Sequence, residues 1–120
     1  GVEFGGGFEL SKMRGSQAND PFEIKDGKVK TTTNNSGGIN GGITNGMPVT
    51  FKCAIKPTPT IGKEQRTVDF TKNENKTFEA TGRHDPCIVH RARVVVDSVT
   101  ALVLCDLLSQ KFGTDWLGEK

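Results

Sequence analysis

Gly82-Arg83-His84-Asp85-Pro86-Cys87 stands directly before a long apolar stretch and decides how the C-terminal helix of this chain begins. Pro86 has no N–H to donate, and its ring disfavours the α conformation for the residue before it. Because proline favours the first helical position, Asp85 is expected to be extended and to act as the helix N-cap. Side chains two apart in an extended segment point the same way, which predicts an Arg83–Asp85 pair. A structural cap is the simpler interpretation, and a catalytic carboxylate is the alternative.

The apolar stretch that follows predicts one long helix over residues 91–112. Its apolar residues recur at helical spacing on adjacent faces, which indicates a helix buried over much of its circumference. Lys111 and then Gly113 are typical of a helix end. We expect residues 113–120 to form a loose tail.

Strand patterns precede this helix. Asp26-Gly27 separates two alternating segments, 22–25 and 28–31, which is a strong hairpin signal. The other expected elements are a strand end at 2–4, a short helix or turn over 8–13 broken at Gly15-Ser16, and strands over 47–55, 65–70 and 76–80 with a polar turn at 73–75. The predicted class is α+β, with antiparallel hairpins packed against the C-terminal helix.

Length and composition indicate a domain that is marginal on its own. Of the 120 residues, 33% are hydrophobic and 15 are glycine. Glycine raises the entropic cost of folding, and so small an apolar share offers little to offset it. The sequence starts at Gly1 without an initiator methionine or signal segment, so we expect a piece that packs against chain outside it.

Charge and cysteine content argue against several functional classes. A net charge of +2 gives no broad basic field for nucleic acid. The three cysteines are far apart and form no CxxC pair, which favours reduced thiols in the cytoplasm over a disulfide framework or a zinc site. His84 and His90 have no ligand partner at helical spacing, so no metal is expected. No run approaches the roughly 20 apolar residues of a membrane span.

Two further segments carry candidate chemistry. Lys56-Pro57-Thr58-Pro59-Thr60 places an ammonium and two hydroxyls on a stiff backbone, which suits a phosphate or a flavin edge; a rigid surface linker is the alternative. Residues 34–46 form a glycine-rich loop whose backbone N–H groups can approach a planar or anionic ligand. Ile39 and Ile43, four residues apart, are apolar side chains that can anchor this loop by packing, which a flexible linker does not need.

The roles of three other residues near the helix start stay open. Cys87 is a weak candidate nucleophile, and a small buried filler is its alternative. Arg91 and Arg93 suit either a phosphate or a solvated helix end.

Taken in order, these segments resemble the C-terminal part of the chorismate synthase family. The resemblance covers nearly the whole chain up to about Leu108. The segments that carry it are residues 1–4, 15–16, 19–20, 35–39, 41–43, 56–60 and 82–87. Each segment is weak alone, but their shared order and spacing are specific.

The resemblance implies a lyase of the shikimate pathway, which leads to the aromatic amino acids. Such an enzyme converts 5-enolpyruvylshikimate 3-phosphate to chorismate and phosphate by a 1,4-anti-elimination, and it requires reduced FMN without net redox change. The family resemblance also implies a cytoplasmic homotetramer whose subunits sandwich helices between antiparallel sheets, a β-α-β sandwich.

The resemblance also implies roles for particular residues. Arg83 corresponds to an arginine at the flavin and the substrate, and Asp85 to a carboxylate that assists proton movement at flavin N5. Asn35 is a further candidate at the same pocket. The implied cofactor-binding residues are Arg83, Gly41, Lys56, Pro57, Thr58, Pro59 and Thr60.

Other active-site residues of the family, including paired histidines and several arginines, belong to an N-terminal part that this sequence lacks. We therefore treat residues 1–120 as the C-terminal fragment of a single-domain enzyme and expect it to form no chorismate alone. The alternative is a non-catalytic ligand-binding or assembly domain that retains the fold.

Overall fold

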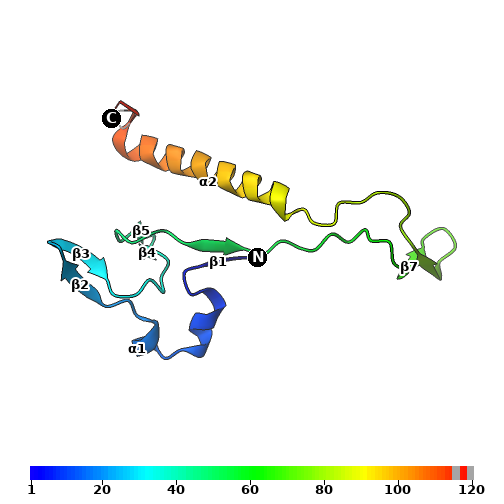
Figure 1. Cartoon of the computed structure of the whole chain (residues 1–120), viewed down its shortest axis with the longest axis horizontal. Coiled ribbons are helices and arrows are strands. Elements are labelled where there is room, and N and C mark those ends of the chain that lie inside the picture. The colour runs from blue at the N-terminus through cyan, green and yellow to red at the C-terminus, as the bar shows by residue number, and fades with distance from the viewer. Residues whose placement is uncertain (115–116, 119–120) are drawn as a thin grey trace. The chain divides into compact units, whose positions relative to one another are not determined.

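The structure is a computed structural model that describes residues 1–114 and 117–118 (Figure 1). It divides into two compact units, Gly1–Ala54 and Ile55–Lys120. The proposed loose tail over 113–120 falls partly outside the described residues. No helix among the described residues is both long and apolar enough to span a membrane.

The first unit is built on a short antiparallel pair. Strand β1 (Val2–Phe4) pairs with β6 (Phe51–Cys53), which places Glu3 opposite Lys52 and the Phe4 and Phe51 ring centroids 5.7 Å apart. The strand end at 2–4 is confirmed. The strand predicted over 47–55 is shorter than expected, because Pro48 has no N–H for a ladder.

Two short helices follow β1. The 3₁₀ helix η1 (Gly7–Lys12) confirms the helix or turn predicted over 8–13. As predicted, this helix does not continue through Gly15-Ser16, since it ends at Lys12; a second helix, α1 (Gly15–Ala18), starts there instead. Its single turn is closed by the Asn19 N–H, which donates to the Gly15 carbonyl at 2.9 Å.

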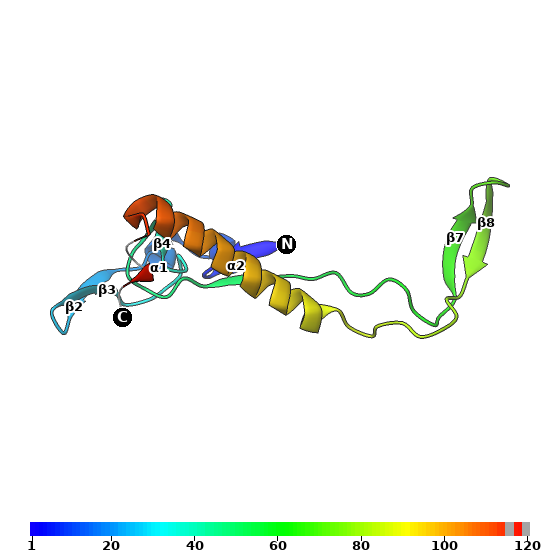
Figure 2. The same cartoon turned by 90° about the horizontal axis from the view of Figure 1, so that it is seen from above.

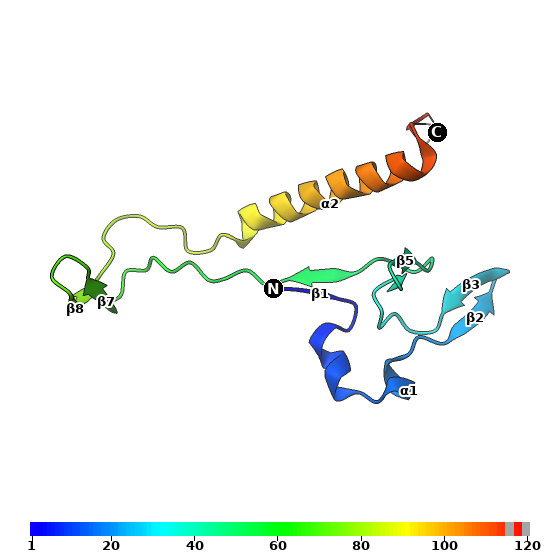
Figure 3. The same ribbon diagram turned by 180° about the vertical axis from the view of Figure 1, so that it is seen from behind.

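The hairpin predicted at Asp26-Gly27 is confirmed (Figure 3). Strand β2 (Phe22–Lys25) pairs antiparallel with β3 (Lys28–Thr31). Asp26 and Gly27 both have positive φ, 53° and 72°, which is the signature of a type I′ turn. Local turn chemistry therefore sets the register of this hairpin.

A second, smaller hairpin lies inside the glycine-rich loop. Strand β4 (Ile39–Asn40) pairs antiparallel with β5 (Ile43–Thr44). Gly41 and Gly42 connect them with φ of 57° and 80°, again the conformation of a type I′ turn. The glycine-rich segment is therefore an ordered turn in this structure, and Ile39 and Ile43 lie in its two strands.

The second unit contains one hairpin and one long helix (Figure 2). Strand β7 (Gln65–Asp69) pairs antiparallel with β8 (Glu74–Phe78), which confirms two strands. The turn predicted at 73–75 is wrong, since the turn occupies residues 70–73. The Asp69 carboxylate accepts the N–H groups of Thr71 and Lys72 at 3.0 and 3.3 Å and so turns the chain early.

The helix α2 (Val89–Phe112) confirms the long C-terminal helix and, with the antiparallel hairpins, the α+β class. Gly113 has φ 63° and stands at its C-cap, as predicted. The predicted N-cap is wrong: the helix starts after Ile88, and no side chain caps it. Pro86 therefore lies outside the helix, and Asp85 precedes the N-cap Ile88 by three residues.

Little of the described chain is buried. Thr31, Gly37, Gly38 and Ala80 are the buried residues among those described, and α2 contains none. The expectation of a helix buried over much of its circumference is thus wrong for this chain. A helix that is apolar over a wide arc needs covering elements, and the described part of its own unit leaves none of its residues buried.

Candidate functional site

The residues singled out from the sequence fall in both units. Asn35 and Gly41 lie in the first, and the candidates at residues 56–60, 83 and 85 lie in the second. No group of three or more histidine, cysteine, aspartate or glutamate side chains suited to a metal occurs in the described part of the chain.

Asp20 holds the start of the glycine-rich loop. Its Oδ1 accepts the Asn35 N–H at 2.7 Å and the Thr33 hydroxyl at 2.6 Å, and its Oδ2 accepts the Ser36 N–H at 2.7 Å. We call these four residues the Asp20 anchor. Partial desolvation raises the pKa of Asp20, but the hydrogen bonds from Thr33, Ser36 and Asn35 outweigh it and lower the pKa to about 2.

Asn34 and Asn35 continue this network. The Asn34 side chain accepts the Gly38 N–H at 2.7 Å and donates to the Pro48 carbonyl at 2.9 Å. The Asn35 amide donates to the Gln17 carbonyl at 3.4 Å, the long end of hydrogen bonding. The backbone of the loop is therefore held tightly, while the Asn35 amide is held weakly.

The Asp20 anchor predicts acid sensitivity of the first unit. Because the folded-state pKa lies below the usual 3.8, the stabilisation is complete above that value and is lost as pH falls towards about 2. We expect amide hydrogen-exchange protection of Asn35 and Ser36 to fall across this window. Asp20→Asn, which keeps one acceptor oxygen but turns an NH₂ towards a backbone N–H, should cost roughly 2 kcal/mol and flatten this pH dependence. Unchanged protection from pH 5 to pH 2 would contradict the prediction.

Gly41 sits at an open position of the β4–β5 turn. A Cβ built on it meets nothing within 4 Å, so its φ of +57°, not crowding, favours glycine there. The turn therefore presents backbone without a side chain, which leaves room for a ligand to approach.

Residues 56–60 have no regular secondary structure, and the chain bends at Pro59. Lys56 is exposed, whereas the Thr58 Oγ1 is shielded from solvent and has no hydrogen-bond partner among the described residues. The Pro59 carbonyl accepts the Gln65 side-chain amide at 3.2 Å, which ties the segment to β7. One hydrogen bond thus ties the segment to its surroundings, and the Thr58 hydroxyl has no partner in the part of the chain that the structure describes.

Asp85 forms an ion pair, but not with the expected arginine. Arg91 in the first turn of α2 donates from Nη1 to Oδ2 at 2.7 Å and from Nη2 to Oδ1 at 3.5 Å. The predicted Arg83–Asp85 pair is therefore wrong, because the fork of Arg91 meets both carboxylate oxygens. Arg83 is exposed, and Cys87 is also exposed, which contradicts the interpretation of Cys87 as a buried filler.

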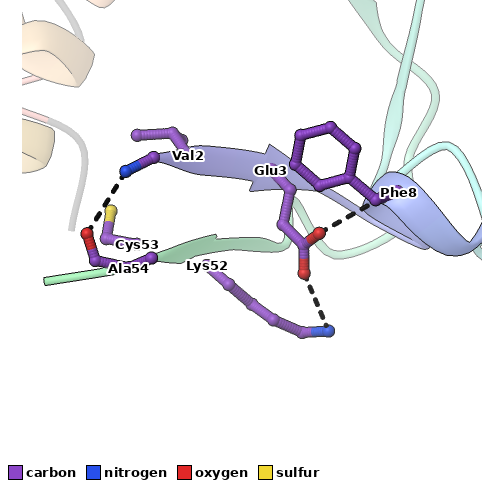
Figure 4. A pocket seen from close by; sticks show the side chains of 7 residues that line it. Val2, Glu3, Phe8, Lys52, Cys53 and Ala54 are labelled. Carbon is purple, nitrogen blue, oxygen red and sulfur yellow. Dashed lines mark hydrogen bonds and ion pairs between the residues drawn. The ribbon is translucent and has the colours of Figure 1, made fainter.

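A pocket of about 340 Å³ lies beside β1 and β6 in the first unit (Figure 4). Glu3 accepts the Phe8 N–H at 3.2 Å and pairs with Lys52 at 3.3 Å; the Phe8 and Lys52 contacts lower the pKa of Glu3. The pocket is lined by Gly1, Val2, Glu3, Phe8, Lys52, Cys53 and Ala54. None of the predicted site residues lines this pocket.

Sequence reasoning assigned no role to Asp20, Asn34 or Arg91 as partners of the candidate residues. A weak signal exists for the first two, since short Asp and Asn side chains in polar loops favour bonds to nearby backbone. For Arg91, the only such signal is its predicted place at the start of a helix that directly follows residues 82–87.

Comparison with known proteins places these motifs in one family. A family model described as chorismate synthase matches residues 1–109. Chorismate synthase of Archaeoglobus fulgidus is 55% identical over 108 residues, which are 90% of this chain and 30% of that protein. Chorismate synthase of Thermococcus kodakarensis is 55% identical over 111 residues, 92% of this chain and 31% of the relative.

A solved structure described as a crystal structure of chorismate synthase is 49% identical and covers 50% of this chain and 18% of its own, with a TM-score of 0.47. The chain spans about 30% of the length of the curated relatives and matches their C-terminal portion. A family-model match over residues 1–109 includes every candidate residue discussed above. The chain therefore belongs to the chorismate synthase family.

Proposed function

We propose that this chain is the C-terminal part of an enzyme that converts 5-enolpyruvylshikimate 3-phosphate to chorismate and phosphate by 1,4-anti-elimination with reduced FMN. The family match over residues 1–109 is the observation that carries this proposal. It supports a lyase acting in aromatic biosynthesis, in the cytoplasm, and a homotetramer as the complete assembly.

The residues of this chain suit a flavin that carries a phosphate. Lys56 supplies an exposed ammonium, the Thr58 hydroxyl lacks a partner among the described residues, and the backbone at Gly41 has open space beside it. Ammonium and hydroxyl donors are appropriate partners for phosphate oxygens and for polar ring edges. We assign Gly41, Arg83 and the segment 56–60 to flavin binding.

The chemistry that reduced FMN supplies when bound is transient electron donation as phosphate leaves. The residues of this chain then bind the substrate and move the proton. The Arg83 guanidinium offsets the negative charge of the substrate, which carries carboxylates and a phosphate. The elimination releases one proton and phosphate from the substrate, and the Asp85 carboxylate assists proton movement at flavin N5.

The uncovered helix supports the proposal that the complete subunit forms a sandwich. Leu102, Val103 and Leu107 of α2 are 70%, 52% and 55% exposed. Burying such side chains is favourable by roughly 1.5–3 kcal/mol each. In the proposed β-α-β sandwich, sheets of the complete subunit would cover these side chains.

A segment replacement tests the proposed function. The matching 108 residues of the Archaeoglobus fulgidus relative are exchanged for those of this chain, and chorismate formation is measured with chemically reduced FMN. We call this protein the chimera. We expect chorismate to form. A chimera that folds and binds FMN but releases no phosphate from the substrate would overturn the proposal.

The chain alone should be inactive. It spans about 30% of its relatives and buries almost no side chain among the described residues, so it offers only part of a pocket. We expect no chorismate above background when the purified chain is incubated with substrate and reduced FMN. The chimera is the positive control, and measurable turnover by the chain alone would contradict this prediction.

A further inference from the structure

We propose that Arg91 is a positioning residue that orients the Asp85 carboxylate for proton movement. The inference rests on the proposed function, because the role of Asp85 belongs to it. Arg91 holds Oδ2 of this carboxylate at 2.7 Å and reaches Oδ1 at 3.5 Å, the long end of hydrogen bonding, across a separation of six residues.

Asp85 needs such a partner because its own segment gives it little support. Residues 83–85 have no regular secondary structure, and the Asp85 side chain is 49% exposed. In the part of the chain that the structure describes, the two bonds from Arg91 are the hydrogen bonds this carboxylate accepts. Without them the carboxylate would be free to change rotamer.

The backbone of Arg91, by contrast, is held in the first turn of a helix. Its backbone N–H donates to the Ile88 carbonyl at 3.0 Å, in the first turn of the 24-residue helix α2. A planar guanidinium that contacts both oxygens fixes the plane of a carboxylate as well as its position. A lysine at the same site would keep the charge but lose the fork.

Because the Arg91–Asp85 pair is exposed to solvent, its effect on activity can be measured separately from its effect on stability. Arg91 is 77% exposed, and an exposed ion pair contributes little to stability. Removing Arg91 should therefore leave the fold intact while it releases the carboxylate. Arg93 offers a matched control, since it is 80% exposed and pairs with Asp97 at 3.7 Å on the same helix.

The test uses Arg91→Leu, Arg91→Lys and Arg93→Leu in the chimera, with Asp85→Ala alone and combined with Arg91→Leu. We expect Arg91→Leu to lower kcat roughly 10- to 100-fold, the effect of a misplaced catalytic group. The KM for substrate, the Kd for FMN and the unfolding temperature should stay unchanged. Arg91→Lys should recover part of kcat, Arg93→Leu should match the parent, and Arg91→Leu should cost nothing further when Asp85 is alanine.

A second readout needs no flavin. In the flavin-free chimera labelled with ¹³C at aspartate Cγ, the Asp85 resonance is assigned by its loss in Asp85→Ala. It should shift in Arg91→Leu and stay in place in Arg93→Leu. An unshifted resonance, a parental kcat in Arg91→Leu, or additive losses in the double variant would overturn the positioning role. A parental kcat in Asp85→Ala would instead overturn the role given to Asp85 under the proposed function, and the positioning role with it.

Discussion

Replacing Gly5 with alanine should destabilise the first unit by about 3 kcal/mol or more, because backbone atoms already occupy the space of a methyl group. A Cβ on Gly5 would lie 2.1 Å from the Asn35 carbonyl oxygen and 2.4 Å from the Gly37 nitrogen. The φ of +53° adds strain for any side chain.

The clash cannot be relieved locally. The Gly5 N–H donates to the Thr50 carbonyl at 3.0 Å, and the next N–H donates to the Asn35 carbonyl at 2.8 Å. Moving the Gly5 backbone or the segment 35–37 away from the new methyl group would break these hydrogen bonds. It would also disturb the Asp20 anchor, in which Asp20 accepts the Asn35 N–H. The substitution therefore disrupts the junction between β1 and the glycine-rich loop.

Gly27→Ala is the matched control, and the unfolding free energy of both variants is measured by urea denaturation of the chimera. Gly27 has φ +72°, but a methyl group added there would meet nothing within 4 Å, so only the conformational cost of about 1 kcal/mol applies. Equal losses of unfolding free energy in the two variants would contradict the predicted crowding at Gly5.

The features that the sequence predicted correctly are those set by neighbouring residues. Asp26-Gly27 specifies its own turn conformation, and Gly113 supplies the positive φ that ends α2. The hairpins, the long helix and thus the α+β class follow from such local signals. The family resemblance, carried by segments in order, could also be found from the sequence alone.

The features that it missed depend on partners far along the chain or outside it. Asp20 contacts Asn35 across 15 residues, and no local pattern indicates that distance. Pro86 predicts a helix start and therefore a cap at Asp85, but α2 begins beyond Pro86 and Arg91 is the partner of Asp85. The apolar pattern of α2 predicted burial, yet burial needs covering elements that these residues do not include.

Asp85→Ala should lower kcat of the chimera by roughly 10²- to 10⁴-fold, the range for loss of a group that transfers protons. The KM for substrate should change little, because we propose that cations such as Arg83, and not Asp85, bind the negative charges of the substrate. Chorismate formation with reduced FMN measures both constants. This is the larger of the two effects expected at the Asp85–Arg91 pair, since Arg91 acts only through the carboxylate.

Stability distinguishes this outcome from a structural role. Asp85 is about half exposed and caps no helix, so its loss should leave the unfolding temperature of the chimera unchanged. Asp97→Ala removes another exposed, arginine-paired carboxylate from the same helix region and should keep the parental kcat. Near-normal turnover in Asp85→Ala would leave Asp85 as an ion-pair partner only and favour a non-catalytic role. A large loss of kcat at unchanged stability requires that the carboxylate itself takes part in the reaction.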